Sequence, residues 1–132
     1  MIAFFPGKFQ PPHIGHIMTT ARILNTYEKV IVGISGDVPK EGQVCSSETI
    51  KQVFETIFIN EKERFSIIEF PGILTEYKTV ESFPYFDILI TAGNDKVIDW
   101  AKRLGIRYSN ISRSEPKNII TKGTYIREKL CQ

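Results

Sequence analysis

Two histidines near the start of the chain have a spacing that indicates phosphate chemistry. His13 and His16 lie three residues apart, directly behind the first apolar segment, with Gly15 between them. Residues three apart share one side of a helical turn, so both imidazoles can face the same phosphate. Lys8, five residues before His13, adds a long cationic side chain. Phosphoryl-type transfer depends mainly on positioning and on neutralising charge, and these residue types suit that task.

The backbone around the histidines also favours an anion. Gly7 and Gly15 allow a ligand to approach closely, because neither has a β-carbon. A helix that begins near Ile14 points free N–H groups and its positive dipole end at such a ligand. The alternative for a His-x-x-His pair is a surface pair or half of a zinc site. Zinc needs further ligands, and the chain has no other histidine and only two cysteines, both distant.

A second cluster of small, hydroxyl and cationic residues lies near the other end of the chain. It runs from Lys122 through Gly123 and Thr124 to Arg127, and its composition suits the start of another helix. Two helix starts that favour phosphate, at opposite ends of a short chain, suggest a nucleoside triphosphate held between them.

Alternating patterns predict the elements that position these residues. Apolar runs predict strands at 2–5, 30–34, 65–70, 87–91 and 107–109, and helical spacing predicts helices at 14–24, 95–104 and 125–130. Ser46 is expected to cap a further helix whose buried stripe is Ile50, Val53, Phe54 and Ile57. Gly105 is expected to end the helix over 95–104, and the crossover over 74–82 is expected to be short or irregular.

This order predicts one α/β domain over residues 1–132. Its five strands form a parallel sheet with helices on both faces. Ligands of such sheets bind beyond the carboxyl ends of the strands, where the strand order reverses. Segments 7–16, 33–37 and 92–95 follow predicted strands and are therefore expected to meet at that crevice. Trp100 and Phe86 are expected to lie in the core.

Composition excludes several classes of protein. A net charge of +2 with scattered Lys and Arg does not indicate a nucleic-acid surface. The first residues lack the pattern of a signal peptide, and no apolar run approaches the ~20 residues that a membrane span needs. Cys45 and Cys131 form no metal-ligand pair and are expected to be free thiols. These observations predict a cytoplasmic protein.

The segment from Gly7 to His16 resembles the signature of the HxGH nucleotidyltransferases, the cytidylyltransferase-like superfamily. The resemblance implies a Rossmann-like fold and in-line attack by an acceptor, usually phosphorylated, on the α-phosphate of a nucleoside triphosphate. It also implies that pyrophosphate leaves and that Mg²⁺ accompanies the triphosphate. His13 and His16 would bind phosphates and stabilise the transition state, and Lys8 would be the basic residue of the loop.

The resemblance extends over nearly the whole chain. The cluster at 122–127 is similar to the family motif Ile-Ser-x-Thr-x-Ile-Arg, which implies that Thr124 and Arg127 hold the β and γ phosphates, with Lys122 in place of the usual serine. Residues 93–95 match the turn beside the base and ribose, and Arg113 matches an arginine shortly before the last motif. The implied catalytic residues are His13, His16, Lys8 and Arg127. The implied nucleotide-binding residues are Gly7, Phe9, Gly15, Gly93, Asn94, Asp95, Arg113, Lys122, Gly123 and Thr124.

The acceptor and the nucleotide stay open. Segments 35–46 and 70–78 are expected to wall the acceptor pocket, with Asp37, Lys40 and Lys51 as candidate contacts. Gln10 resembles the loop of archaeal-type nicotinamide mononucleotide adenylyltransferases. Chain length and the Glu48–Lys51 spacing look more like glycerol-3-phosphate cytidylyltransferase. CMP transfer from CTP is slightly favoured, and adenylyl transfer from ATP is the alternative.

Two rival interpretations remain, together with one expectation about assembly. Residues 13–16 also spell the motif of class I aminoacyl-tRNA synthetases, but the chain has 132 residues and no Lys-Met-Ser-Lys-Ser-like loop. A non-catalytic nucleotide-binding module is the other rival. Small members of the family are commonly dimers, so a homodimer is an expectation of the resemblance.

Overall fold

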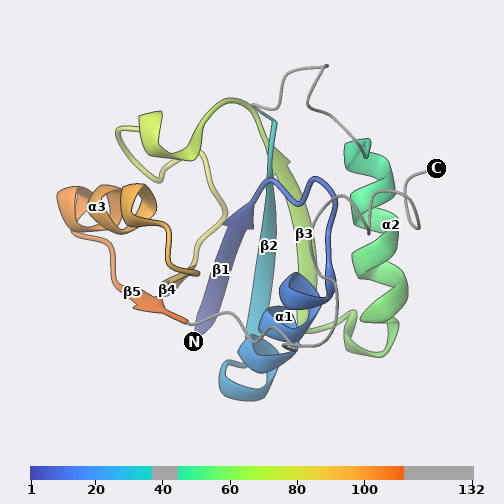
Figure 1. Cartoon of the computed structure of the whole chain (residues 1–132). Helices are drawn as coiled ribbons and strands as arrows, with labels where there is room; N and C mark the ends of the chain where they lie inside the picture. Colours follow the sequence, from blue (N-terminus) through green and yellow to red (C-terminus); the bar gives the residue numbers. More distant parts are fainter. Residues whose placement is uncertain (37–44, 112–132) are drawn as a thin grey trace.

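The computed structural model describes residues 1–36 and 45–111 of the chain, and Figure 1 shows the arrangement of its elements. The elements, with η marking short 3₁₀ helices, are β1 (Ile2–Gly7), α1 (Ile14–Thr26), β2 (Lys29–Ser35), α2 (Ser47–Ile57), η2 (Ile59–Glu61), β3 (Phe65–Phe70), η3 (Leu74–Glu76), β4 (Ile88–Thr91), α3 (Asp95–Leu104) and β5 (Tyr108–Asn110). The predicted five-stranded parallel sheet is confirmed, with the order β3-β2-β1-β4-β5.

The strand order reverses beside β1. The chain passes from β1 outward to β2 and β3, then crosses back over the sheet to β4 on the other side of β1. The crevice between the carboxyl ends of β1 and β4 is therefore the place where a sheet of this kind binds ligands. The prediction that segments following β1, β2 and β4 meet at one edge of the sheet follows from this topology.

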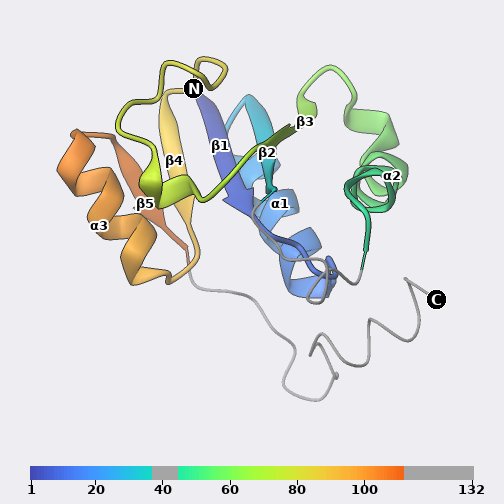
Figure 2. The ribbon, with the colours of Figure 1, turned by 90° about the horizontal axis from the view of Figure 1, so that it is seen from above.

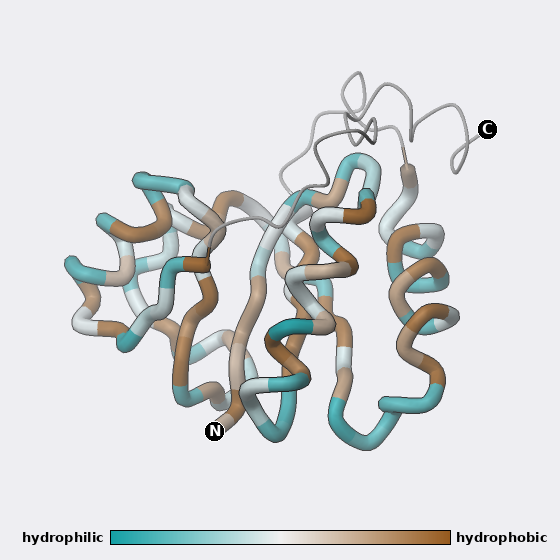
Figure 3. Tube along the Cα trace, turned by 60° about the horizontal axis from the view of Figure 1, so that its bottom comes forward, coloured by the Kyte–Doolittle hydropathy of each residue, from teal (hydrophilic) through white to brown (hydrophobic). Residues whose placement is uncertain are grey.

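Alternate residues along each central strand enter different cores. In β1, Ala3 and Phe5 face the cluster that contains α1 and α2, and Phe4 faces the cluster that contains α3. Figure 2 shows α1 and α2 on one side of the sheet and α3 on the other. In Figure 3 the hydrophobic positions of the helices form discontinuous stripes, as expected when one face of a helix packs and the other meets water. Helices on both faces are thus confirmed.

Trp100 and Phe86 both belong to the core on the α3 side, as predicted. Trp100 is fully buried, and Phe86 is partly buried and packs against the same cluster. The Nε1–H of Trp100 donates to the carbonyl of Tyr77, 2.8 Å away, so α3 is tied to the segment that follows η3.

The predicted element positions agree with the structure to within two residues at most ends. Ser46 caps α2 through a hydrogen bond from the Thr49 N–H, and Gly105 ends α3 with a φ of 69°. The crossover after β3 is irregular apart from the single turn η3, as expected. The predicted helix over 125–130 lies outside the described residues.

Ile57 is a wrong position in the predicted buried stripe of α2, and Val53 is only partly buried. Ile57 is 50% exposed, whereas Ile50 and Phe54 are fully buried. The next residue, Phe58, enters the core instead, and its ring stacks on Phe65 with the centroids 5.3 Å apart. The helix ends at Ile57, so the chain turns there and brings Phe58, rather than Ile57, against the edge strand.

The prediction that Cys45 is a free thiol is also wrong. Cys45 is buried and disulfide-bonded, so it is not a free thiol, while Cys131 lies outside the described residues. Within the described ranges, none of the helices has both the length and the apolar character needed to cross a membrane.

Candidate active site

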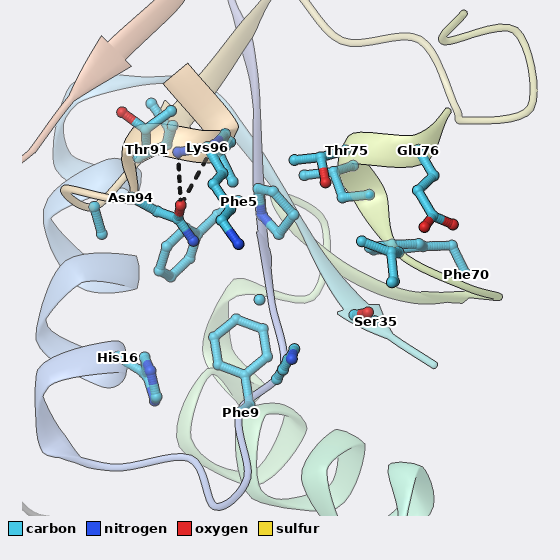
Figure 4. Close-up of a pocket in the computed structure, with 18 residues that line it drawn as sticks. Phe5, Phe9, His16, Ser35, Phe70, Thr75, Glu76, Thr91, Asn94 and Lys96 are labelled. Carbon is cyan, nitrogen blue, oxygen red and sulfur yellow. Dashed lines mark hydrogen bonds between the residues drawn. The ribbon is translucent and has the colours of Figure 1, made fainter. Parts of the chain in front are cut away.

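A cavity of about 700 Å³ opens at the carboxyl ends of the central strands, beside the point where the order reverses (Figure 4). Its walls come from β1 and the loop behind it, from the ends of β2, β3 and β4, from η3 and from the start of α3. The lining residues are Phe5, Pro6, Gly7, Lys8, Phe9, His16, Ser35, Phe70, Ile73, Leu74, Thr75, Glu76, Ile90, Thr91, Ala92, Asn94, Lys96 and Val97.

The two histidines form the N-terminal cap of α1. His13 is the N-cap residue, and its Nδ1 accepts the Gly15 N–H at 3.0 Å. His16, three residues on, accepts the His13 N–H through its own Nδ1 at 3.1 Å. This is the reciprocal arrangement of a capping box, with imidazoles in the places usually held by a hydroxyl and a carboxylate. The spacing that indicates phosphate chemistry therefore also begins the helix.

The cap assigns a tautomer to both rings. Each Nδ1 accepts a backbone N–H, so the proton of each neutral imidazole lies on Nε2. The rings stack with centroids 3.8 Å apart and planes 26° apart, which makes their donors neighbours. Two Nε2–H groups at one helix start can donate to oxygens of a single phosphate.

The same cap corrects one expectation about the helix start. The N–H groups of Gly15, His16 and Ile17 all have acceptors on His13, either its ring or its carbonyl, so they are not free for a ligand. His16 lines the cavity, whereas His13 is not among the lining residues.

Phe9 fixes the position of the His16 ring. Its own ring is 3% exposed and meets His16 edge-on, with centroids 4.8 Å apart. Phe9 has a φ of 52°, which is unusual for a residue with a side chain and is a strained conformation. A β-carbon on Gly7 would approach the Phe9 ring to 2.9 Å, so only glycine fits beneath that ring. The strained turn at Phe9 thus holds a residue of the cavity wall.

Gln10 ties the histidine loop to the start of α2. Its amide donates to the Cys45 carbonyl and accepts the Cys45 N–H, both at 2.8 Å. Cys45 immediately precedes the Ser46 cap, so this double hydrogen bond couples the loop to the entrance of α2. Gln10 has a positioning role that the sequence does not reveal.

On the β4 side, the wall of the cavity is built around the turn between β4 and α3. Asn94 caps α3 by accepting the N–H groups of Lys96 and Val97 through Oδ1, as Figure 4 shows. Asn110, on the neighbouring strand, accepts from the Thr91 hydroxyl at 2.9 Å and from the Gly93 N–H at 2.8 Å. Asn110 therefore holds the turn in place from outside the cavity.

The structure places the predicted site residues in three groups. Gly7, Lys8, Phe9, His16 and Asn94 line the cavity. His13, Gly15, Gly93 and Asp95 are neighbours of these residues along the chain but are not among the lining residues, and Lys51 lies on α2 away from the cavity. Asp37, Lys40, Arg113, Lys122, Gly123, Thr124 and Arg127 lie outside the described residues. The roles assigned to all of these residues stay predictions.

Several lining residues carry no sequence signal of their own. Lys96 enters the cavity because it is the second residue of α3, directly behind the Asn94 cap. Its ammonium forms no ion pair with any residue of the described ranges. Thr91 ends β4, and Glu76 lies on the single turn η3. Segment 70–78 does line the cavity, as expected, whereas its role toward an acceptor stays a prediction.

The described residues offer no protein site for a metal ion. They contain no group of three or more His, Cys, Asp or Glu side chains that could hold one. Among the described residues, Glu76 supplies the only carboxylate that lines the cavity.

Comparisons with known proteins place the chain among nucleotide-handling domains. The family model described as cytidylyltransferase-like matches residues 4–128. Nicotinamide-nucleotide adenylyltransferase 1 of Sulfolobus acidocaldarius is 29% identical over 115 residues, which are 80% of this chain and 65% of the relative. Phosphopantetheine adenylyltransferase of Syntrophotalea carbinolica is 31% identical over 78 residues, 59% of this chain and 46% of the relative.

Solved structures share the fold. A bifunctional NMN adenylyltransferase/ADP ribose pyrophosphatase from Francisella tularensis, complexed with AMP and a Mn ion, superposes with a TM-score of 0.68 at 20% identity. The superposition covers 97% of this chain and 40% of that one. The fold of this chain thus corresponds to one part of the longer Francisella tularensis protein.

Proposed function

We propose that this chain, which belongs to the cytidylyltransferase-like family, transfers an adenylyl group from ATP to a small phosphorylated acceptor. A phosphate oxygen of the acceptor attacks the α-phosphorus of ATP, and a new P–O–P bond forms. The bond from the α-phosphorus to the oxygen bridging to the β-phosphorus breaks in line, and its electrons leave with pyrophosphate. No covalent enzyme intermediate is required, so the protein contributes positioning and charge stabilisation.

The observation that carries the proposal is the histidine capping box at the start of α1, which holds both rings with Nδ1 toward the backbone. Both are fixed by backbone hydrogen bonds before any ligand binds. The five-coordinate transition state places more negative charge on the α-phosphate oxygens than the ground state does. Donors that need no reorganisation therefore stabilise the transition state more than the bound substrate.

Cations around the cavity complete the site. Lys8 and Lys96 line it from the β1 loop and from α3, and both can approach the triphosphate. By the family resemblance, Thr124 and Arg127 contact the β and γ phosphates from the end of the chain. Mg²⁺ enters as part of the substrate, MgATP, since the described residues form no metal site. The Mn ion in the Francisella tularensis complex supports the use of a divalent ion.

The relatives support ATP as the donor. Both curated relatives described above are named adenylyltransferases. Their names do not support the transfer of CMP from CTP, which the sequence analysis slightly favoured. The chain spans 65% of one and 46% of the other, so the acceptor is part of the proposal. Nicotinamide mononucleotide (NMN) and phosphopantetheine are the two acceptors that these names suggest.

The test uses analogues of ATP that differ in which phosphate bridge can break. The protein is incubated with Mg²⁺, each acceptor and one of ATP, CTP, the α,β-methylene analogue of ATP or the β,γ-imido analogue. We expect an adenylylated product from ATP, with release of pyrophosphate, and from the β,γ-imido analogue, with release of imidodiphosphate. We expect none from the α,β-methylene analogue, because attack at the α-phosphorus must break the α–β bridge. Chromatography of the products and pyrophosphate release are the measurements.

Each other result identifies a different function. Product from CTP but not from ATP would indicate cytidylyl transfer. An adenylate formed from an amino acid would indicate the chemistry of an aminoacyl-tRNA synthetase. Binding of MgATP without product from any acceptor would indicate a nucleotide-binding module. Release of inorganic phosphate from the γ position would contradict attack at the α-phosphorus.

A further inference from the structure

The cavity has a second wall whose chemistry differs from that of the phosphate side. It is formed after β3 by Phe70, Ile73, Leu74, Thr75 and Glu76. In Figure 4, Thr75 and Glu76 lie across the cavity from Lys96 and Asn94. Apolar side chains therefore flank a single carboxylate on this side.

The charges of the two walls are opposite. Lys8, Lys96 and His16 lie on the β1–α1 and α3 sides, whereas Glu76 is the only acidic residue among the described residues that line the cavity. Glu76 forms no ion pair with any residue of the described ranges. A carboxylate next to a triphosphate would repel it, so Glu76 does not suit the donor nucleotide. It suits a positively charged group at the far end of the acceptor.

The wall is held in place before any ligand binds. The N–H groups of Glu76 and Tyr77 bond the carbonyls of Ile73 and Leu74, each at 3.1 Å, which makes the turn η3. From the next layer, Arg103 donates to the Thr75 carbonyl and Trp100 to the Tyr77 carbonyl, on either side of Glu76. A carboxylate on such a supported turn loses little freedom when it contacts a ligand.

We propose that the acceptor carries a cationic group, in addition to its phosphate, and that this group binds against Glu76 beside Phe70 and Ile73. This inference rests on the proposed function, because it assigns the acceptor end of the same cavity. A flat pyridinium ring meets each requirement: it carries a positive charge, it buries apolar surface, and its edge contacts aromatic and aliphatic side chains. NMN is a phosphorylated acceptor of this kind, whereas phosphopantetheine has no positive charge.

The experiment compares NMN with its reduced form, NMNH, which has nearly the same shape and phosphate but an uncharged ring. We expect kcat/KM with ATP to be about fivefold or more higher for NMN than for NMNH. Glu76→Gln should remove most of that preference by raising the KM for NMN, and should leave the values for NMNH and for ATP unchanged. Glu81→Gln, on an exposed carboxylate outside the cavity lining, is the matched control and should behave as the wild type.

Binding provides a readout that does not need turnover. Calorimetric titration of NMN and NMNH into the protein with Mg²⁺ and the α,β-methylene analogue of ATP should show the same preference, and Glu76→Gln should abolish it. Equal affinity for the two forms, or a preference that survives Glu76→Gln, would overturn the inference even if adenylyl transfer occurs. Efficient use of phosphopantetheine with no effect of Glu76→Gln would overturn it as well. A charge preference in binding without any product would instead support the cation subsite and contradict the proposed reaction.

Discussion

At the scale of single residues, the proposed function gives the histidine pair two tasks with different nitrogens. The Nδ1 atoms cap α1, and under the proposal the Nε2 atoms donate to phosphate. Removing a ring would then remove both a helix cap and a proposed phosphate ligand. A substitution that preserves the role of only one of the two nitrogens can separate the effect on stability from the effect on catalysis.

We predict that His16→Asn and His16→Gln have opposite consequences. The Asn oxygen lies where Nδ1 lies in histidine, so His16→Asn should keep the cap but lose the distant donor, and kcat should fall ~10²-fold or more at nearly wild-type stability. The Gln amide reaches the place of Nε2, so His16→Gln should retain more activity while losing about 1 kcal/mol of the free energy of unfolding. Steady-state kinetics and urea unfolding measure the two effects. Wild-type turnover in His16→Asn would remove His16 from the mechanism.

At the scale of elements, α1 is secured at both of its ends. The histidine capping box begins the helix, and Arg64, which precedes β3, reaches its last turn. The Arg64 guanidinium donates to the carbonyls of Leu24, Tyr27 and Glu28 and pairs with the Glu61 carboxylate at 2.9 Å. Carbonyls at a helix C-terminus have no partner within the helix, so a residue distant in sequence satisfies them here.

We predict that Arg64→Ala lowers the free energy of unfolding by about 1–3 kcal/mol, because several carbonyls lose a charged donor at once. Arg64→Lys should recover only part of the loss, since an ammonium cannot match the fork of a guanidinium. Lys62→Ala, on the neighbouring exposed lysine, should change stability by less than about 0.5 kcal/mol. Chemical denaturation of the three variants is the measurement, and equal effects of Arg64→Ala and Lys62→Ala would contradict this role.

The starts of β1 and β4 are joined by a carboxylate. Asp87 accepts the Ile2 N–H at 2.7 Å, donates its own N–H to the Ile2 carbonyl at 2.8 Å, and accepts the Tyr85 hydroxyl. The hydrogen bond from Tyr85, followed by that from Ile2, holds the pKa of Asp87 below its ordinary value. The same hydrogen bond to the Asp87 carboxylate raises the pKa of Tyr85 above its ordinary value.

These shifts predict how stability depends on pH. The native state binds a proton at Asp87 less tightly than the unfolded state, so this contribution is present above about pH 4 and is lost as pH falls through the lowered pKa. The Tyr85 contribution is present below about pH 10 and is lost as pH rises through the raised pKa. In unfolding measured at a series of pH values, Asp87→Asn should lack both the loss of stability at acid pH and the loss at alkaline pH. Asp99→Asn, on an exposed carboxylate of α3, should keep the wild-type dependence of stability on pH. Identical acid slopes for the wild type and Asp87→Asn would contradict the assignment.

At the scale of the whole molecule, the cavity joins elements from both layers. Its walls include the end of β1, next to α1, and the start of α3, on the other face of the sheet. A ligand seated there contacts segments that separate on unfolding, so its binding must stabilise the whole fold. Trp100, the single tryptophan of the chain, lies on α3 and is fully buried in the core on that side of the sheet, so its fluorescence reports on that packing. The homodimer implied by the family resemblance stays a prediction.

We predict that MgATP raises the unfolding midpoint more than MgCTP does. At a concentration of 100 Kd, a ligand adds about 2.7 kcal/mol to the free energy of unfolding, which corresponds to a rise of roughly 10 °C for a chain of this size. The red shift of Trp100 emission on heating is the measurement, and Lys96→Ala should reduce the rise. A larger rise with CTP than with ATP would contradict the proposed donor.

The sequence by itself determined the features that depend on local spacing. Apolar runs and capping residues such as Ser46 and Gly105 are read from a few adjacent positions, so the elements and the parallel sheet were predictable. The histidine loop was placed at the crevice correctly, because a strand's direction decides at which edge its following loop emerges. The roles assigned to the site residues stay predictions.

Only the tertiary structure decided which distant groups meet. Lys96 and Glu76 line the same cavity because η3 packs against α3, and no local pattern encodes that contact. The hydrogen bonds of Arg64 to α1 and the exchange of Ile57 for Phe58 in the core arise from the paths of the backbone in space. Sequence periodicity reports which face of an element is apolar, whereas the partner of that face depends on strand order and crossovers, which bring together residues far apart along the chain.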